Sequence, residues 1–209
     1  FLSLTLLFTL ILPARAAKTA SRYYVDALNG SDENDGLSPK SAWQTVHKAA
    51  EHEFAPGERL LLRRGQSFEG GFVAKGSGSE KAPVVLSAYG NGADPLIRAK
   101  EWEFLFILQN VSHWVIEGLE FTSDGFGAAI LAVNGAVTED ITVRNCYFHD
   151  IPAAMCNAEY SAIYIDNDRV SARVSGVHLD SLRIENTAWG IHTKGTNAED
   201  SEETFVSPE

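Results

Sequence analysis

One apolar pattern occurs three times in the second half of the chain, and it restricts the fold more than any other feature. Each copy carries apolar residues at the same four offsets, and the copies span Trp114–Phe121, Ile141–Phe148 and Val177–Ile184. In each copy a polar dipeptide separates two pairs with strand spacing: Glu117-Gly118, Arg144-Asn145 and Asp180-Ser181. A strand alternates its faces with a period of two, so the inserted residue shifts that phase by one. The pattern predicts two short strands that both point inward and are joined by a bend.

The repetition predicts a solenoid. A second apolar segment follows each copy, at residues 129–133, 162–165 and 189–192. The repeat lengths are 27 residues from Phe121 to Phe148 and 36 from Phe148 to Ile184, so loops of unequal size would project from a constant core. A β-sandwich is the alternative, but a sandwich does not require one four-point template three times in order. We expect stacked coils whose core contains Ile116, Leu119, Phe121, Val143, Phe148, Leu179, Leu182 and Ile184.

The N-terminal half contains the only expected helix. A short strand at residues 23–25 leads into a loop rich in Asn, Asp and Gly. Ser38 is a suitable N-cap and Pro39 a suitable first residue for a helix that reaches Phe54, with Trp43 among its apolar residues. Strands are expected at residues 59–64, 68–73, 84–88 and 104–108. We expect the helix to cover the N-terminal end of the solenoid, because its apolar stripe needs a partner and the first strand edges need protection.

The first 16 residues have the features of a secretory signal peptide that is incomplete at its start. An apolar run of about a dozen residues precedes the small-x-small sequence Ala14-Arg15-Ala16. This run is too short to span a bilayer, which takes about 20 residues. The sequence predicts a secreted or periplasmic protein that does not insert into the membrane.

Charge and cysteine content narrow the choice of partners. The net charge is −11, from 17 basic and 28 acidic residues, and this balance argues against a nucleic-acid partner. An anionic polymer would be repelled at long range unless a local basic cluster or a bound cation reversed the field. Two cysteines, Cys146 and Cys156, are too few to staple a fold of 209 residues. A bridge between them is one interpretation, and a small buried Cys146 is the favoured one.

Several motifs carry a family resemblance. Residues 23–46, together with residues 56–65, 75–78 and 82–90, resemble the N-terminal cap of pectate-lyase-like right-handed parallel β-helix proteins. The resemblance covers nearly all of the chain after the signal peptide. It implies an all-β fold, a right-handed parallel β-helix with a short N-terminal capping α-helix. It also implies a secreted, carbohydrate-active protein with a polysaccharide substrate, in a superfamily whose members are often considerably longer.

The expected organisation has four parts. Residues 1–16 are the signal peptide, 17–112 the cap and first coils, 113–194 the repeated coils, and 195–209 an acidic tail or the start of a further coil. The last part has Phe205 and Val206 as its large apolar residues, too few to cover the open end of a solenoid. We therefore expect an N-terminal fragment of a protein that is monomeric when complete.

The fold suggests chemistry, and two sets of residues are candidates for it. A lyase needs Ca²⁺, Arg or Lys to neutralise a uronate and a base to remove the neighbouring proton, whereas a hydrolase needs two carboxylates. Asp166 and Asp168 follow one second apolar segment, and His192 and Lys194 occupy the matching place one coil later. Stacking would bring them together, with Lys194 and His192 as catalytic candidates and Asp166 and Asp168 as Ca²⁺ ligands; a solvated turn is the alternative.

Three further features are weaker. His149 follows the strand that ends at Phe148 and is a third catalytic candidate, with a polar rim that closes the strand as the alternative. The loop at residues 29–35 offers oxygen ligands for Ca²⁺ without EF-hand spacing, and turn stabilisation is favoured there. Arg63 and Arg64 are candidates for contact with an acidic sugar, or else a polar strand end.

The expected activity is β-elimination on an acidic polysaccharide by a polysaccharide lyase. The clustered aspartates of calcium-dependent pectate lyases, and the Asn-Thr-Asp and Gly-His-Gly motifs of polygalacturonases, are not recognisable in the sequence. Two alternatives therefore stay open. One is a non-catalytic carbohydrate-binding or surface-adhesion module, and the other is a glycoside hydrolase on the same fold.

Overall fold

The computed structural model describes residues 20–100, 103–152, 160–167 and 171–195. Within these ranges the chain winds into successive coils, and each coil adds one strand to each of three parallel sheets. Sheet A consists of β1 (Arg22–Val25), β2 (Arg59–Arg63), β5 (Val84–Tyr89), β8 (Ser112–Glu117), β11 (Val137–Arg144) and β14 (Arg173–Asp180). Sheet B consists of β3 (Ser67–Glu69), β6 (Leu96–Ala99), β9 (Glu120–Ser123), β12 (Tyr147–Ile151) and β15 (Arg183–Thr187). Sheet C consists of β4 (Phe72–Val73), β7 (Phe106–Gln109), β10 (Ala128–Ala132), β13 (Ser161–Asn167) and β16 (Trp189–Lys194).

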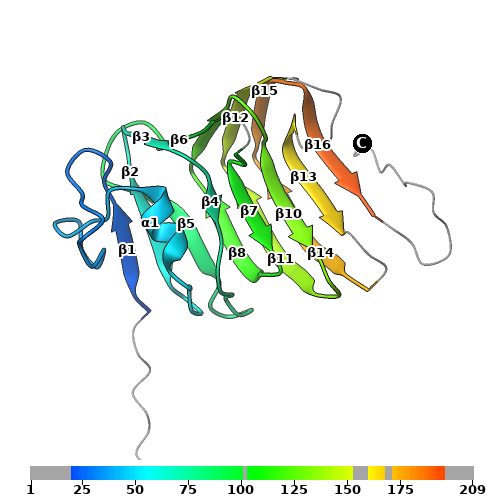
Figure 1. Ribbon diagram of the computed structural model, residues 1–209, viewed down its shortest axis with the longest axis horizontal. Helices are drawn as coiled ribbons and strands as arrows, with labels where there is room; N and C mark the ends of the chain where they lie inside the picture. The colour runs from blue at the N-terminus through cyan, green and yellow to red at the C-terminus, as the bar shows by residue number, and fades with distance from the viewer. Residues whose placement is uncertain (1–19, 101–102, 153–159, 168–170, 196–209) are drawn as a thin grey trace, which may run out of the picture.

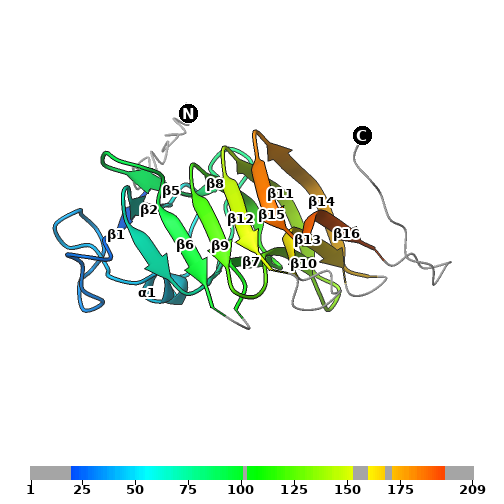
Figure 2. The same cartoon turned by 90° about the horizontal axis from the view of Figure 1, so that it is seen from above.

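The coils stack in chain order along the long axis, from β1 at one end to β16 at the other (Figures 1 and 2). The expected right-handed parallel β-helix is confirmed. Among the described residues, no helix is both long and apolar enough to cross a membrane.

The core is built from ladders of like side chains. Phe121 is in register with Phe148, which is in register with Ile184, as the 27- and 36-residue spacings predict. The rings of Phe121 and Phe148 stack with centroids 4.7 Å apart. Of the eight expected core residues, the five in the coils of β8 and β11 are completely buried. Leu179, Leu182 and Ile184 pack against the same core but are only partly buried, because they belong to the last described coil.

The polar dipeptides form the bends between sheets A and B. Gly118, Asn145 and Ser181 all adopt left-handed backbone conformations, with φ of 66°, 52° and 52°. They occupy equivalent positions in three successive coils, so the bend is itself a stacked feature. Glycine and asparagine tolerate this conformation, which explains two of the three residues. The phase shift predicted from the sequence is therefore a real turn of the chain.

The predicted strand at residues 68–73 is wrong as a single element. It divides into β3 and β4, because the chain turns at Gly70, with φ of 93°, from sheet B into sheet C.

The predicted helix is also wrong in its bounds. Helix α1 (Val46–Glu51) begins after Thr45, whose side chain accepts a hydrogen bond from the backbone N–H of Lys48. Ser38 caps no helix; its hydroxyl lies 2.8 Å from that of Ser41 in a turn. Trp43 forms a parallel bridge with Val25 and so belongs to the edge of sheet A.

The capping role of this region agrees with the prediction. Val46 and Ala49 of α1 are buried in the main core cluster, together with Trp43, which is 6% exposed. The helix lies beside β4 at the N-terminal end of the coils (Figure 1).

Cys146 is a buried free thiol, as favoured from the sequence, and Cys156 lies outside the described residues. Burial raises the pKa of the Cys146 thiol to about 11, so this cysteine is protonated at neutral pH. The signal-peptide segment and the acidic segment after residue 195 also lie outside the described ranges.

Candidate functional site

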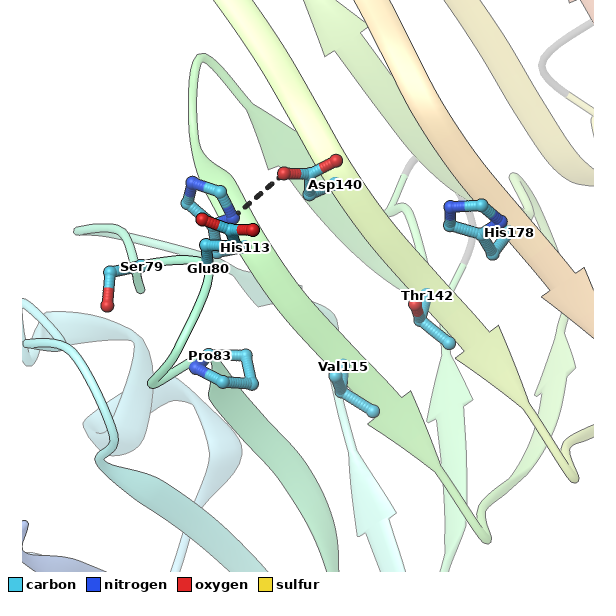
Figure 3. A pocket seen from close by; sticks show the side chains of 8 residues that line it. All are labelled: Ser79, Glu80, Pro83, His113, Val115, Asp140, Thr142 and His178. Atoms are coloured by element: carbon cyan, nitrogen blue, oxygen red, sulfur yellow. Dashed lines mark ion pairs between the residues drawn. The ribbon is translucent and has the colours of Figure 1, made fainter.

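A groove of about 330 Å³ lies on the outer face of sheet A (Figure 3). Strands β8, β11 and β14 form its floor, and a loop between β4 and β5 forms one wall. Its lining residues are Ser79, Glu80, Pro83, His113, Val115, Asp140, Thr142 and His178.

A second backbone bend occurs at equivalent positions in the three strands that form the floor of the groove. His113, Asp140 and Gly176 have left-handed φ angles of 57°, 53° and 63°. None of the three is paired with a residue of the neighbouring strand. The residues before them pair with one another (Ser112, Glu139 and Ser175), and so do the residues after them (Trp114, Ile141 and Val177). Non-glycine residues in this conformation are uncommon, although Asp and His are among those that tolerate it.

The bend turns the side chains of His113 and Asp140 toward each other. Nδ1 of His113 lies 3.1 Å from Oδ2 of Asp140. The His113 side chain is 20% exposed and that of Asp140 is 53% exposed. The imidazole is therefore mostly buried, whereas the carboxylate is accessible to solvent. Beside the pair, Thr142 of β11 lies in register between Val115 of β8 and His178 of β14.

Glu80 comes from the tip of the loop that forms the wall. Ser79 and Ala82 exchange two backbone hydrogen bonds of 3.0 and 2.9 Å, which close a tight turn around Glu80. The base of the loop is tied to β8, because the indole N–H of Trp114 donates to the carbonyl of Gly76 at 3.0 Å and the Ser77 hydroxyl accepts from the backbone N–H of Ser112. Glu80 lines the groove together with His113 (Figure 3). Two carboxylates and two imidazoles therefore share this groove.

Among the described residues, no lysine or arginine lines the groove. Four arginines on or beside sheet A are paired with carboxylates. Arg59 and Arg144 both contact Glu117, at 3.5 and 2.6 Å, and Arg64 contacts Asp94. Arg63 lies 3.4 Å from the buried carboxylate of Asp26. The arrangement around Arg63 and Arg64 agrees with the polar strand end rather than with a site for an acidic sugar.

The first set of sequence-predicted residues is brought together on the outer face of sheet C. Asp166 of β13 is in register with Lys194 of β16, and Tyr164 is in register with His192. The Tyr164 hydroxyl donates to Oδ2 of Asp166 at 2.5 Å. The solvated-turn alternative is wrong for Asp166 and Lys194, since both lie within strands. Asp168 lies outside the described residues.

His149 lies on a different face, the outer side of sheet B. Its Nε2 is 2.9 Å from Oε1 of Glu120 and its Nδ1 is 2.8 Å from Oδ2 of Asp150. Asp150 also accepts a hydrogen bond from Asn186 in the next coil, and the hydrogen bonds from His149 and Asn186 lower the pKa of Asp150. The expected strand end at Phe148 is wrong, because β12 continues to Ile151, and whether His149 is catalytic stays a prediction. Both ring nitrogens contact carboxylates, and because Glu120 belongs to the preceding coil, His149 links two successive coils.

Calcium stays a prediction. In the ranges that the structure describes, no group of three or more His, Cys, Asp or Glu residues is arranged to hold a metal ion. In the loop at residues 29–35, Asp32 accepts hydrogen bonds from the backbone N–H groups of Gln44 and Thr45 and from the Thr45 hydroxyl. Its carboxylate therefore stabilises the turn, as favoured from the sequence.

Sequence reasoning missed the groove because its residues are far apart in the chain and none belongs to the apolar template. One signal was present. His113, Asp140 and Gly176 each come directly before a copy of the template, at Trp114, Ile141 and Val177. Two of these three residues are polar, and the repeated position marks a stacked column on the outer face.

Comparison with known proteins identifies relatives with the same fold. No protein-family profile matches the chain. A lacto-N-biosidase of Bifidobacterium longum subsp. longum is 23% identical over 204 residues, an overlap that covers 69% of this chain and 13% of the relative. The chain thus spans about an eighth of the length of that relative.

Solved structures give the same result. A GH136 lacto-N-biosidase from Eubacterium ramulus matches with a TM-score of 0.68 and 22% identity, over 80% of this chain and 34% of that protein. A rhamnogalacturonan lyase matches with a TM-score of 0.50 and 15% identity, over 83% of this chain and 54% of the lyase. The narrower likeness to pectate lyases gains no support from these neighbours. The chain shares its right-handed parallel β-helix with proteins named for the cleavage of carbohydrates.

Proposed function

We propose that this β-helix acts on a neutral glycan, as a glycoside hydrolase. One observation carries the proposal: in the part of the chain that the structure describes, the groove on sheet A is lined by two carboxylates, Glu80 and Asp140, and by no lysine or arginine. Hydrolysis of a glycosidic bond uses a pair of carboxyl groups, one as acid and the other as base or nucleophile. Glu80 and Asp140 are the pair that we assign to these roles.

The same composition argues against the lyase activity expected from the sequence. Elimination from a uronate requires a cation to neutralise the sugar carboxylate. In this groove that carboxylate would lie against Glu80 and Asp140, and like charges at short distance repel. The names of two neighbours, both lacto-N-biosidases, also fit a hydrolase better than a lyase.

A non-catalytic glycan-binding module is the second candidate, and one observation favours it. Glu80, Asp140 and His178 are all exposed, so the groove excludes little water. Catalytic carboxylates commonly act in sites that exclude water, whereas binding alone does not require this.

Activity assays with matched variants test the proposal. The purified chain would be incubated with neutral oligosaccharides such as lacto-N-tetraose and cellotetraose, and separately with polygalacturonate and alginate. We expect new reducing ends from a neutral substrate and no unsaturated product from the polyuronates. Asp140→Asn and Glu80→Gln should each lower turnover by at least about 100-fold, in the range that general acid–base catalysis contributes.

Glu139→Gln is the control, since Glu139 neighbours Asp140 but pairs with Arg173 outside the groove. Its turnover should stay within about twofold of the parent chain, a change well below the catalytic contribution. Unsaturated product from a polyuronate would overturn the hydrolase in favour of a lyase. Binding without any cleavage would favour the module.

A further inference from the structure

We propose that Gly176 is a positioning residue, which seats the Asp140 carboxylate so that the groove binds a short neutral saccharide. The inference rests on the proposed function and deepens it. It starts from the column His113, Asp140 and Gly176, in which three successive coils bend at the same place.

The space beside Gly176 is occupied by the carboxylate of Asp140. A Cβ atom on Gly176 would lie 2.6 Å from Oδ1 of Asp140, too close unless the carboxylate moves, and 3.2 Å from the Asp140 backbone nitrogen, a tight contact. With φ of +63°, Gly176 also has a backbone conformation that a side chain disfavours. The absence of a side chain at this position therefore makes room for the carboxylate of the preceding coil.

The two oxygens of Asp140 then face different coils. Oδ2 lies 3.1 Å from Nδ1 of His113, and Oδ1 lies against Gly176. His113 contacts one oxygen of the carboxylate, the missing side chain of Gly176 leaves room for the other, and 53% of the Asp140 side chain stays exposed. A carboxylate that His113 holds on one side can accept hydrogen bonds from sugar hydroxyls with a smaller loss of rotamer freedom.

The rest of the groove suits a neutral sugar. Val115 and Pro83 offer apolar contact for the C–H face of a pyranose, and Thr142 and His178 offer hydrogen bonds to its hydroxyls. A volume of about 330 Å³ is near the lower end of small-ligand sites, which suits a short saccharide. Glu80 and Asp140 disfavour a uronate in the same place.

Binding of two disaccharides, followed by NMR, tests this inference. The probes are N-acetyllactosamine, which is neutral, and digalacturonate. We expect the neutral disaccharide to shift the imidazole signals of His113 and His178, and digalacturonate to leave both unchanged.

Glycine variants then test the positioning role. Gly176→Ala should shift the His113 ring signals in the free protein, because Asp140 must move, and should weaken binding of N-acetyllactosamine by at least about tenfold. Gly90→Ala is the matched control, since Gly90 also has a left-handed backbone, with φ of +79°, and a Cβ atom there meets no atom within 4 Å. Its affinity should stay within about twofold of the parent chain, a change of less than half a kcal/mol.

A double-mutant cycle separates positioning from simple strain. If Gly176 acts through Asp140, then adding Gly176→Ala to an Asp140→Ala chain should cause no further loss of affinity. An additive loss, unchanged His113 signals in Gly176→Ala, or tighter binding of digalacturonate would each overturn the inference. If Gly176→Ala does not fold, the probe shifts at His113 and their loss in Asp140→Asn still decide whether this groove binds the sugar.

The outcome also separates this inference from the proposed function. Hydrolysis of a neutral glycan that is unaffected by Asp140→Asn and Gly176→Ala would leave the function standing and remove the groove from it. Binding of N-acetyllactosamine in the groove without cleavage would support the binding site and contradict the hydrolase function.

Discussion

Phe148 has two aromatic neighbours in the core, both from earlier coils, and Ile184 in register in the next coil. It stacks on Phe121 and lies 6.5 Å, centroid to centroid, from Phe106, and all three rings are fully buried. Such a residue makes the ladder continuous from one coil to the next, because its removal leaves a cavity that rigid strands cannot close.

Phe148→Ala is expected to lower the free energy of unfolding by about 3–5 kcal/mol, the usual cost of emptying a packed aromatic site. Chemical denaturation of the purified chain measures it. Val73→Ala is the control, because Val73 is 44% exposed and its loss should cost no more than about 0.5 kcal/mol. A loss below about 1 kcal/mol for Phe148→Ala would contradict the packing described for this ladder.

Among the described residues, Asp26 is the most deeply buried aspartate. Oδ1 of Asp26 accepts hydrogen bonds from the Gln66 amide at 2.8 Å and from the backbone N–H of Asn29 at 2.9 Å. Burial alone would raise the pKa of Asp26, but the hydrogen bonds from Gln66 and Asn29 outweigh it and hold the pKa below its ordinary value of 3.8. The folded protein therefore binds this proton more weakly than the unfolded chain does.

Because the pKa of Asp26 is lowered on folding, the stability of the protein should depend on pH. The stabilisation by Asp26 is present above the unfolded pKa of 3.8 and is lost as the pH falls through the lower folded pKa. The melting temperature should therefore fall below about pH 4, and Asp26→Asn should be less stable at pH 7 with a shallower acid slope. Asp32 contributes in the same direction, so the slope should not vanish. An unchanged slope in Asp26→Asn would contradict the assignment.

Helix α1 shows where local sequence rules fail at the scale of an element. Ser38 and Pro39 satisfy the rules for a helix start, but tertiary contacts draw residues 38–44 into a turn and a bridge to β1. Asp32 then fixes the true start, because it binds the backbone N–H groups of Gln44 and Thr45. These contacts cross a dozen residues, and no local pattern encodes them.

Asp32→Ala should lower the free energy of unfolding by about 1–3 kcal/mol, since it leaves three donors near the helix start without their acceptor. Asp35→Ala is the control, because the exposed Asp35 accepts from Leu37 outside this region. Thermal unfolding of both variants would compare them. Equal melting temperatures would show that Asp32 does not hold the cap.

The strands were more predictable than the helix, for a physical reason. A ladder requires the same inward side chains in every coil, so the apolar template repeats in the sequence and predicts the register of Phe121, Phe148 and Ile184. The outer face has no such constraint. Whether His113 and Asp140 meet depends on the bend and on the length of each loop, and neither is visible in the apolar pattern. The predicted pairing of Asp166 with Lys194 was found because it follows from register alone.

At the scale of the whole molecule, the solenoid presents three outer faces with different chemistry. Sheet A carries the groove with two carboxylates, sheet B carries the network around His149, and sheet C carries Asp166 beside Lys194. The net charge is −11, and Arg59, Arg63 and Arg144 of sheet A are paired with carboxylates. This electrostatic character favours a neutral glycan over a polyuronate.

The most direct test of a hydrolase with a neutral substrate is the fate of solvent oxygen. The chain would cleave lacto-N-tetraose or cellotetraose in water labelled with oxygen-18, and the products would be analysed by mass spectrometry. Hydrolysis adds one water across the broken bond, so we expect one labelled oxygen per cleavage and no unsaturated sugar. Asp140→Asn should abolish this incorporation. Cleavage that yields an unsaturated product without the label would contradict the account and assign an eliminating lyase instead.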